Sequence, residues 1–398
     1  MNELKQLVYP MKTLVIFKDL AEDPVIGSFA SAVAAAADGD TDTAVEHYCR
    51  TVKGLYGFGE DITEYILGRV LEDENMYIIR RAETGVTGTL MDECLSSELY
   101  ALENLAKLPC DTLLGSLSYD GFLPRYLTSD LDFSAAYADR IHNLSKHGFG
   151  IYSSHHVFVV ENGRPVPVDH PDSTRLSQLY GYELERKQVI DNTLALLGGK
   201  PSNNVLLYGQ CGTGKSSTVK AIANEYAKDG LRLIEIKKKQ LHELPDIIDI
   251  ICCNPLKFII FIDDLTFTED DDDYAALKAI LEGSVNSSAD NVCIYATSNR
   301  RHLVRETFES RKGDEVHFND TMAELLSLSD RFGLTVTFQK PDKSHFLELI
   351  EQLAKQYEVA VPTDELKKQA EMFALARGGR SPRIAKQFIE YTKGMEEL

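Results

Sequence analysis

Apolar and polar positions follow different periods in two parts of the chain. From Met11 to about His147 apolar residues recur three and four positions apart, as they do from Leu90 to Leu105, which is typical of amphipathic helices. Near residue 150 the period changes, and Val157 to Val160, Asn162-Gly163 and Val166 to Val168 together predict a β-hairpin. We therefore expect a helical first part, followed by a part that contains strands.

The second part begins with this hairpin and a polar stretch. Pro165 and Pro167 should confine the second arm of the hairpin to a sheet edge, because proline has no N–H to donate. A helix is expected from about Glu183 to Leu197. Apolar strands and helical segments then alternate, which predicts a parallel sheet covered on both faces. The expected strands are Asn204 to Tyr208, Leu231 to Ile236, Phe258 to Ile262, Val292 to Ala296 and Leu334 to Phe338.

Beyond Pro341 only helices are expected, with start signals at Asp342, at Thr363 and at Ser381-Pro382. A length of 398 residues suits two or three folded units. We expect an acidic α-helical N-terminal domain over residues 1–150, which should bind a partner. A hairpin and a linker are expected over residues 151–178. An α/β domain over 179–340 and an α-helical lid over 341–398 should follow.

Charge and composition narrow the range of partners. The formal net charge is -20, and residues 1–150 hold 24 acidic and 12 basic side chains, so the N-terminal domain is not expected to bind nucleic acid. The longest apolar runs are far shorter than a membrane span, and Leu14 to Phe17 is too short for the core of a signal peptide. Seven cysteines without a C-x-x-C spacing indicate reduced thiols. We expect a cytoplasmic protein with no membrane partner.

The strongest chemical signal is the segment Gly209 to Ser217, GQCGTGKSS, which fits G-x-x-x-x-G-K-[ST] between an expected strand and an expected helix. This setting favours a phosphate-binding loop for ATP over a coincidental glycine-rich turn. Lys215 should reach the outer phosphates and Ser216 should hold Mg²⁺. Cys211 is either a redox-sensitive thiol or a small side chain that fits the loop. The other loop residues expected to wrap the phosphates are Gly209, Gly212, Thr213, Gly214 and Ser217.

Polar side chains also follow two of the expected strands. Asp263 and Asp264 come directly after Phe258 to Ile262, at the strand end where ligands bind in open α/β sheets. Asp263 is the expected partner of Mg²⁺, and Asp264 should orient or deprotonate the attacking water. Asn299 follows a later strand and is either a second water-holding group or an ordinary turn residue.

Together with Asp330-Arg331-Phe332-Gly333 and with Arg383 in GRSPRIA, these motifs resemble the AAA+ P-loop ATPase superfamily. More narrowly, KFIIFIDDL, LKAILEGS, IYATSNRRHL and LSLSDRFGL resemble the bacterial AAA+ family catalogued as domain of unknown function 815. The resemblance implies a five-stranded parallel sheet in the order 5-1-4-3-2, a helical lid, and an active site shared between subunits. It also implies an arginine finger at Arg331, a phosphate-sensing lid arginine at Arg383, and an adenine site near Tyr180 and Gly181.

Each arginine has a structural alternative: Arg331 could pair with Asp330 or Asp263, and Arg383 could extend along its own helix. Arg380 and Arg301 are nearby competitors for these roles. Asp264 stands where most AAA+ enzymes carry glutamate, so hydrolysis is expected to be slow. Lys237 to His242, after the second expected strand of the ATPase domain, lacks the aromatic-apolar-glycine loop of threading unfoldases.

Two functions of different classes are compatible with these residues. The first is an ATPase that couples ATP binding and hydrolysis, with Mg²⁺, to remodelling or assembly of a macromolecular partner. The alternative is a nucleotide-gated scaffold or DNA-associated loader that binds ATP but hydrolyses it slowly. For both we expect a nucleotide-dependent homo-oligomer and an unidentified protein or nucleic-acid partner.

Overall fold

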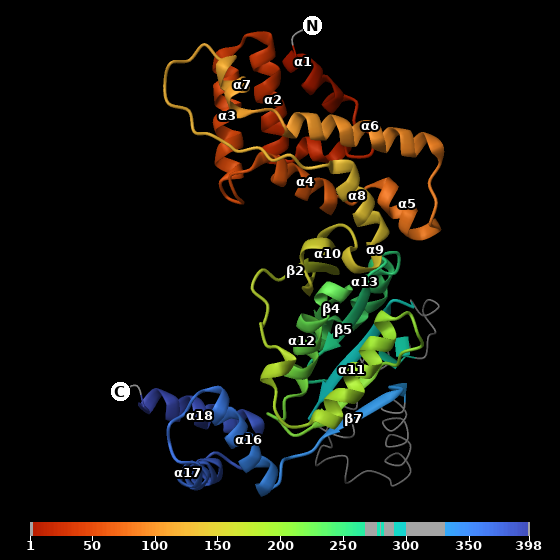
Figure 1. Ribbon diagram of the computed structural model, residues 1–398. Helices are drawn as coiled ribbons and strands as arrows, with labels where there is room; N and C mark the ends of the chain where they lie inside the picture. The colour runs from red at the N-terminus through yellow and green to blue at the C-terminus, as the bar shows by residue number, and fades with distance from the viewer. Residues whose placement is uncertain (1–2, 267–276, 279, 282–289, 300–330, 397–398) are drawn as a thin grey trace. The chain divides into compact units, whose positions relative to one another are not determined.

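The computed structural model describes residues 3–266, 277–278, 280–281, 290–299 and 331–396 (Figure 1). It divides into two compact units. The first holds Met1–Ser154 with Cys253–Pro255, and the second holds His155–Cys252 with Leu256–Leu398.

The first unit is helical over its described residues, apart from one isolated bridge between Asp61 and Leu127. Aspartate and asparagine side chains start several of its helices: Asp23, for example, accepts hydrogen bonds from the backbone N–H groups of Val25 and Ile26. Its elements are α1 (Glu3–Val8), η1 (Tyr9–Lys12), η2 (Lys18–Glu22), α2 (Pro24–Asp38), α3 (Thr41–Leu55), α4 (Ile62–Glu72), α5 (Met76–Thr84), α6 (Thr89–Ala106), α7 (Cys110–Gly115), α8 (Phe133–His142), α9 (Leu144–His147) and α10 (Ile151–Ser154).

A large apolar core and one buried carboxylate hold this unit together. Aromatic side chains such as Phe17, Phe29 and Tyr137 are almost completely buried in the core. Glu98 on α6 is also buried, and its carboxylate accepts hydrogen bonds of 2.7 to 3.2 Å from the backbone N–H groups of residues 15, 16 and 17. The charge is compensated by these donors, so Glu98 anchors the segment ahead of η2 to the longest helix.

The second unit is built on one sheet of seven strands in the order β2-β1-β4-β5-β6-β3-β7. The expected five-stranded sheet in the order 5-1-4-3-2 is therefore wrong, because β1 pairs in parallel with β4 and the hairpin extends the sheet by two strands. The five strands after the hairpin follow one another as β7-β3-β6-β5-β4. The strands are β1 (Val157–Glu161), β2 (Arg164–Pro167), β3 (Val205–Gly209), β4 (Leu231–Ile236), β5 (Lys257–Ile262), β6 (Val292–Ser298) and β7 (Leu334–Phe338).

The strand β2 lies at the edge of the sheet, as Pro165 and Pro167 predict. Val168 donates its backbone N–H to the Val157 carbonyl at 3.0 Å, so alternate N–H groups of the second arm face β1. Pro165 and Pro167 occupy the intervening positions, where an N–H would point away from the sheet. The outer edge consequently lacks the donors that a further strand would need.

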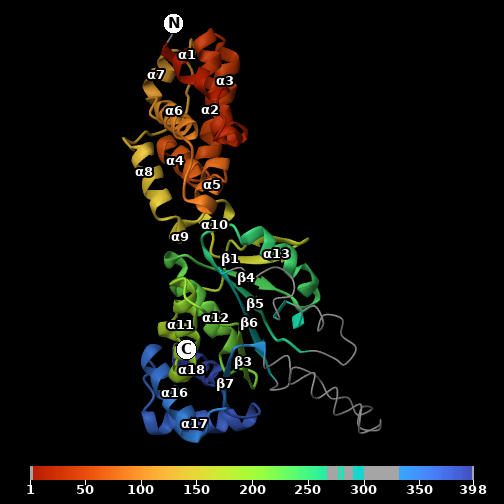
Figure 2. The same cartoon turned by 90° about the vertical axis from the view of Figure 1, so that its right-hand side faces the viewer.

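Helices cover both faces of the sheet. Helices α11 (Glu183–Leu197) and α12 (Lys215–Glu225) pack on one face through Val189, Val219 and Ile222. Figure 2 shows α13 (Leu244–Ile251) on the other side of the strands. All five apolar strands expected after the hairpin are present, with ends that differ by at most two residues.

The chain closes with three helices, α16 (Lys343–Gln356), α17 (Thr363–Ala376) and α18 (Pro382–Glu396), which share a core around Phe346, Ile350 and Ile389. Asp342 caps α16 by accepting from the His345 N–H at 2.9 Å. The start signal assigned to Thr363 is wrong in detail, because Pro362 precedes the helix and Thr363 is its first residue. None of the described helices has the length and apolarity that crossing a membrane requires.

Candidate nucleotide-binding site

Three glycines shape the loop between β3 and α12. Gly209 has a φ of 152°, and a Cβ built there would overlap the carbonyl oxygen of Phe338 on the neighbouring strand β7. Gly212 and Gly214 have φ values of 80° and 93°, in the left-handed region that favours glycine. Gly214 is also the N-cap of α12, whose free N–H groups and dipole favour an anion. The loop that the sequence assigned to phosphate therefore has the required shape.

Lys215 is the first residue of α12 and is only 6% exposed. Its Nζ donates to the carbonyl oxygens of Gly209 at 2.7 Å and Gln210 at 3.0 Å, and to Oδ1 of Asn299 at 3.0 Å. Burial lowers the pKa of this lysine, and the nearby carboxylates of Asp263 and Asp264 counteract part of that effect. Three oxygen acceptors thus hold the ammonium group at the carboxyl ends of the strands.

Ser216 and Asp263 form the pair of oxygen groups expected for a cation. The Ser216 hydroxyl donates to Oδ1 of Asp263 at 2.6 Å, and the hydroxyl of Thr297 on β6 donates to the same oxygen at 2.6 Å. A hydroxyl beside an exposed carboxylate suits Mg²⁺, which prefers oxygen ligands and takes the rest of its shell from phosphates and water. Among the residues that the structure describes, no group of three or more His, Cys, Asp or Glu side chains could hold a metal. The fit therefore depends on ligand phosphates.

Asp264 has an unusual backbone conformation, with a φ of 54°. Its N–H donates to the Thr297 hydroxyl at 2.9 Å, and its carboxylate accepts from Nδ2 of Asn299 at 2.6 Å. Left-handed conformations at residues other than glycine are uncommon and concentrate at functional sites. The Asn299 side chain also accepts a hydrogen bond from Lys215. Asn299, which follows β6, therefore connects the P-loop lysine after β3 with the carboxylate after β5.

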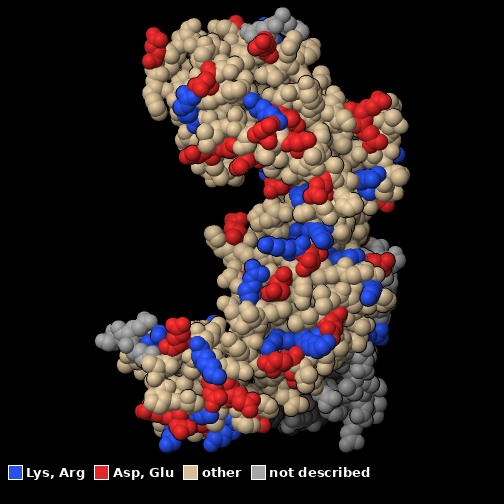
Figure 3. Space-filling view, in the orientation of Figure 1, with Lys and Arg blue, Asp and Glu red and all other residues tan. Residues whose placement is uncertain are grey.

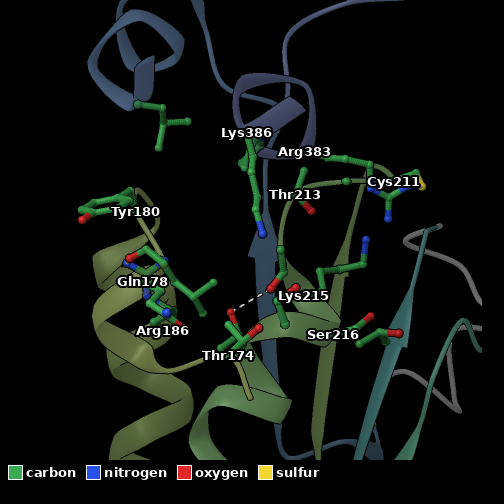
Figure 4. A pocket seen from close by; sticks show the side chains of 18 of the residues that line it. Thr174, Gln178, Tyr180, Arg186, Cys211, Thr213, Lys215, Ser216, Arg383 and Lys386 are labelled. Atoms are coloured by element: carbon green, nitrogen blue, oxygen red, sulfur yellow. Dashed lines mark hydrogen bonds between the residues drawn. The ribbon is translucent and has the colours of Figure 1, made fainter. Parts of the chain in front are cut away.

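These groups line one cavity of about 620 Å³. Figure 4 shows Thr174, Gln178, Tyr180 and Arg186 on one side of the cavity, opposite Thr213 and Ser216. Of the two residues expected at an adenine site, Tyr180 lines the cavity and Gly181 does not, so that role stays a prediction. Sequence reasoning missed further lining residues, which belong to no phosphate-binding motif. They include Ser173, Thr174, Gln178, Arg186, Thr297, Tyr357 and Lys386.

The turn at Gly181 explains how Tyr180 reaches the cavity. Gly181 has a φ of 69° and Tyr182 a φ of 59°, so the chain reverses between the linker and α11. Buried Arg186 holds this turn by donating to the carbonyl oxygens of Gly181 and Leu179. Tyr180 then packs against the core of the three C-terminal helices.

The lid contributes Arg383, at the start of α18. Its backbone N–H donates to the Gly212 carbonyl at 3.2 Å, and its Nη1 lies 3.5 Å from the sulfur of Cys211. Arg380, the competitor for the sensing role, makes two hydrogen bonds of 2.8 and 2.7 Å to the Glu371 carboxylate within the lid. Arg383 rather than Arg380 faces the cavity, and Lys386 one turn further also lines it (Figure 4).

Arg331 lies apart from this group. It lies three residues before the start of β7, at the opposite end of that strand from the loop at Gly209, and it is not among the lining residues. An arginine that acts in a neighbouring subunit would lie outside its own cavity, so its assignment as a finger stays a prediction. Arg301 and the acidic run Glu269 to Asp273 lie outside the described residues.

Two further features of the sequence, the lysine run Lys237 to Lys239 and the pair His155-His156, lie outside the cavity lining. The lysine run ends in a short helix, η5 (Lys238–Glu243), which is tied to β1 by a 3.0 Å bond from Gln240 to the Val160 carbonyl. His156 bonds to Asn224 at 2.9 Å, and His155 lies 4.0 Å from Asp169. Neither histidine belongs to a metal-binding group within the described part of the chain.

The parallel sheet, the P-loop ahead of α12, the carboxylates after β5 and the C-terminal helical lid define a P-loop protein of the AAA+ ATPase class. The chain belongs to the family described as "Protein of unknown function (DUF815)", whose model matches residues 153–396. A comparison with curated proteins finds no match.

Solved structures with a similar fold include the Thermotoga maritima RuvB Holliday junction branch migration motor. It is 18% identical with a TM-score of 0.38, and the match covers 56% of this chain and 65% of that one. Two mutants of the same RuvB match at 17% identity and a TM-score of 0.38, over 56% of this chain and 66% of theirs. The match thus spans just under two thirds of each of those chains.

Proposed function

We propose that this protein is an ATPase that couples the binding and hydrolysis of Mg-ATP to remodelling or assembly of a macromolecular partner. The observation that carries the proposal is one connected set of hydrogen bonds at the P-loop. Lys215 bonds to Asn299, and Asn299 bonds to Asp264. The backbone N–H of Asp264 bonds to Asp263, which also accepts from Ser216. Phosphoryl transfer depends chiefly on positioning and charge neutralisation, and these side chains supply both at one edge of the sheet.

Each side chain has a role that follows from its place. Lys215 and the N–H groups at the start of α12 bind the outer phosphates. Ser216 and Asp263 would hold Mg²⁺, which would supply positive charge to neutralise the phosphates. Asp264 accepts a proton from the attacking water, and Asn299 keeps that carboxylate oriented through their 2.6 Å bond. Arg383 contacts the terminal phosphate from the lid.

Subunit assembly belongs to the same proposal. Arg331 lies outside the cavity lining of its own chain, which fits a group that acts in a neighbouring subunit of a nucleotide-dependent homo-oligomer. The helical first unit would serve as the adaptor for the partner. On the face drawn in Figure 3, acidic and basic side chains of the described residues are interspersed. The formal charge of -20 makes a protein partner a better fit than a nucleic acid.

Lys215→Ala tests the proposal, with Lys220→Ala as its matched control. Both lysines lie on α12, but Lys220 pairs with Glu235 at 3.1 Å and does not line the cavity. Wild type and Lys220→Ala should release phosphate from ATP in a Mg²⁺-dependent manner, and Lys215→Ala should not. Absence of Mg²⁺-dependent release from the wild type would contradict the proposal.

A nucleotide-gated scaffold or loader is the second candidate, and the length of Asp264 favours it. An aspartate carboxylate is one methylene shorter than the glutamate that most AAA+ enzymes have at this position, and it is bonded to Asn299 at 2.6 Å. Hydrolysis would then be slow, and ATP would act by promoting assembly. Sedimentation with and without ATP tests this: Asp264→Asn should assemble as the wild type does. Loss of assembly in that variant would contradict a scaffold role.

A further inference from the structure

One wall of the cavity is a segment without helix or strand over most of its length. We call residues 171–178 the strap; only Leu176–Gln178 forms a single 3-10 turn within it. Ser173, Thr174 and Gln178 of the strap line the cavity. Because the strap has almost no backbone ladder of its own, its position must be set by side chains.

Asn224 supplies most of that positioning. It is 7% exposed, near the end of α12, and its Nδ2 donates to the carbonyl oxygens of Asp172 at 2.6 Å and Thr174 at 2.9 Å. The backbone carbonyl of Asn224 accepts a hydrogen bond from Nη1 of Arg175 at 2.5 Å. Three bonds therefore join three strap residues to one position on the helix that begins with the P-loop lysine.

The amide of Asn224 is held in one orientation by these bonds. Two carbonyl oxygens can be bonded only by the NH₂ group, so Oδ1 must face the 2.9 Å contact with Nε2 of His156. His156 accordingly carries its hydrogen on Nε2. With both donors and one acceptor of the buried amide engaged, its replacement leaves two backbone carbonyls without their partner.

The strap lies opposite the phosphate-binding groups. In Figure 4, Thr174 and Gln178 lie on one side of the cavity, and Thr213 and Ser216 lie on the other. A nucleotide with its phosphates at the P-loop would then present its nucleoside half to the strap. Since α12 is a single helix that carries Lys215 at one end and Asn224 near the other, it fixes the spacing of the two halves.

We propose that Asn224 is the positioning residue for the nucleoside half of the site, and that His156 supports it by fixing its orientation. This inference rests on the proposed function. Asn224 does not line the cavity, so it acts through the strap. Its loss should weaken the contribution of the adenosine group to affinity and leave the contribution of the phosphates unchanged.

Calorimetric titration of the full chain with Mg-ATP, Mg-ADP and Mg-tripolyphosphate separates these two contributions. Asn224→Asp keeps the shape and the acceptor for His156 but removes both donors. It should weaken ATP and ADP binding on the order of tenfold, as expected for two buried hydrogen bonds, and change tripolyphosphate binding less than about twofold. His156→Ala should act in the same direction and to a smaller extent.

Asn192→Ala is the matched control. Asn192 bridges the Asn203 carbonyl at 2.9 Å and the Tyr295 hydroxyl at 3.0 Å, on α11 and outside the cavity lining. It should leave the ratio of ATP to tripolyphosphate affinity at the wild-type value. Tripolyphosphate binding also reports that the P-loop of each variant is folded.

Three outcomes would overturn the inference. Equal losses for ATP and tripolyphosphate in Asn224→Asp would show a general structural role, and unchanged ATP binding would show no role. A larger loss in His156→Ala than in Asn224→Asp would assign the positioning to the histidine. If the wild type bound neither ATP nor tripolyphosphate, the proposed function would fail as well, so the two failures are distinguishable.

Discussion

Nδ2 of Asn299 donates to the Asp264 carboxylate at 2.6 Å, although 35 positions separate the two residues in the sequence. The other end of the same amide accepts from Lys215 at 3.0 Å. The side chain that follows β6 thus connects the lysine of the P-loop with the carboxylate after β5. Under the proposed function, Asn299 would therefore connect the group that binds phosphate with the group that activates water.

Asn299→Ala should lower the rate of phosphate release at saturating ATP by roughly a hundredfold, because Asp264 loses the donor that orients it. The affinity for ATP should change only a few-fold, since the P-loop backbone is untouched. Steady-state kinetics and calorimetry measure the two quantities. Thr335→Ala, at an exposed position of β7, is the control. An unchanged rate would remove Asn299 from the mechanism.

Asp263→Asn should abolish the part of ATP affinity that depends on Mg²⁺. The change removes the charge that faces the Ser216 hydroxyl at 2.6 Å and leaves the size of the side chain the same. Binding measured with Mg²⁺ and again with a chelator should therefore give similar constants in the variant and different ones in the wild type. Ser217→Ala, one residue along the helix, should retain the difference. Retention of the Mg²⁺ effect in Asp263→Asn would contradict the assignment.

The stability of the protein without nucleotide should depend on pH through Lys215. Burial lowers its pKa from the ordinary value of 10.5, so over a window below 10.5 the unfolded chain binds more protons than the folded one. The free energy of unfolding then rises with pH across that window. Lys215→Met lacks this contribution, so its free energy of unfolding should rise less than that of the wild type.

Urea denaturation of both proteins at about pH 7 and about pH 9.5 measures this difference. The stability gain of the wild type over the variant should be larger at the higher pH. Identical pH dependence in the two proteins would mean that Lys215 titrates as it does in the unfolded chain.

Gly209→Ala should destabilise the second unit by about 3 kcal/mol or more, because a Cβ at this φ overlaps the Phe338 carbonyl of β7. Gly68→Ala on α4 is a matched control: a Cβ there has no heavy atom within 4 Å, and alanine should stabilise the helix by up to about 1 kcal/mol. Thermal unfolding, monitored by circular dichroism, distinguishes the two variants. A wild-type melting temperature in Gly209→Ala would contradict the close approach of β3 and β7.

The two lid arginines should separate into one functional and one structural residue. Arg383→Ala should weaken binding of ATP more than of ADP, because its side chain faces the phosphate end of the cavity. Arg380→Ala should instead lower the stability of the lid by breaking the pair with Glu371, and leave the preference between the two nucleotides as it is. Calorimetry with both nucleotides compares them. The reverse pattern would exchange the two roles.

Much of the fold follows from local signals in the sequence. The strands β4 and β7 have the bounds that the apolar pattern predicts, because a buried strand is specified by its own residues. The helix α11 has the expected bounds because Gly198 and Gly199 directly follow its last residue. The P-loop is equally local, since its glycines are needed for conformations that other residues rarely adopt. The residues that we propose for phosphate and cation binding lie in these locally specified segments or directly after them.

The number of strands, the presence of Arg383 rather than Arg380 in the cavity lining, and the cavity wall formed by the strap depend on the tertiary structure alone. The hairpin joins β4, which is more than 60 residues away, and no periodicity within the hairpin encodes that pairing. Asn224 is an ordinary helix residue until folding brings Asp172, Thr174 and His156 to it. Local propensities determine the elements and the phosphate loop, whereas contacts between distant segments determine which polar groups face the same cavity.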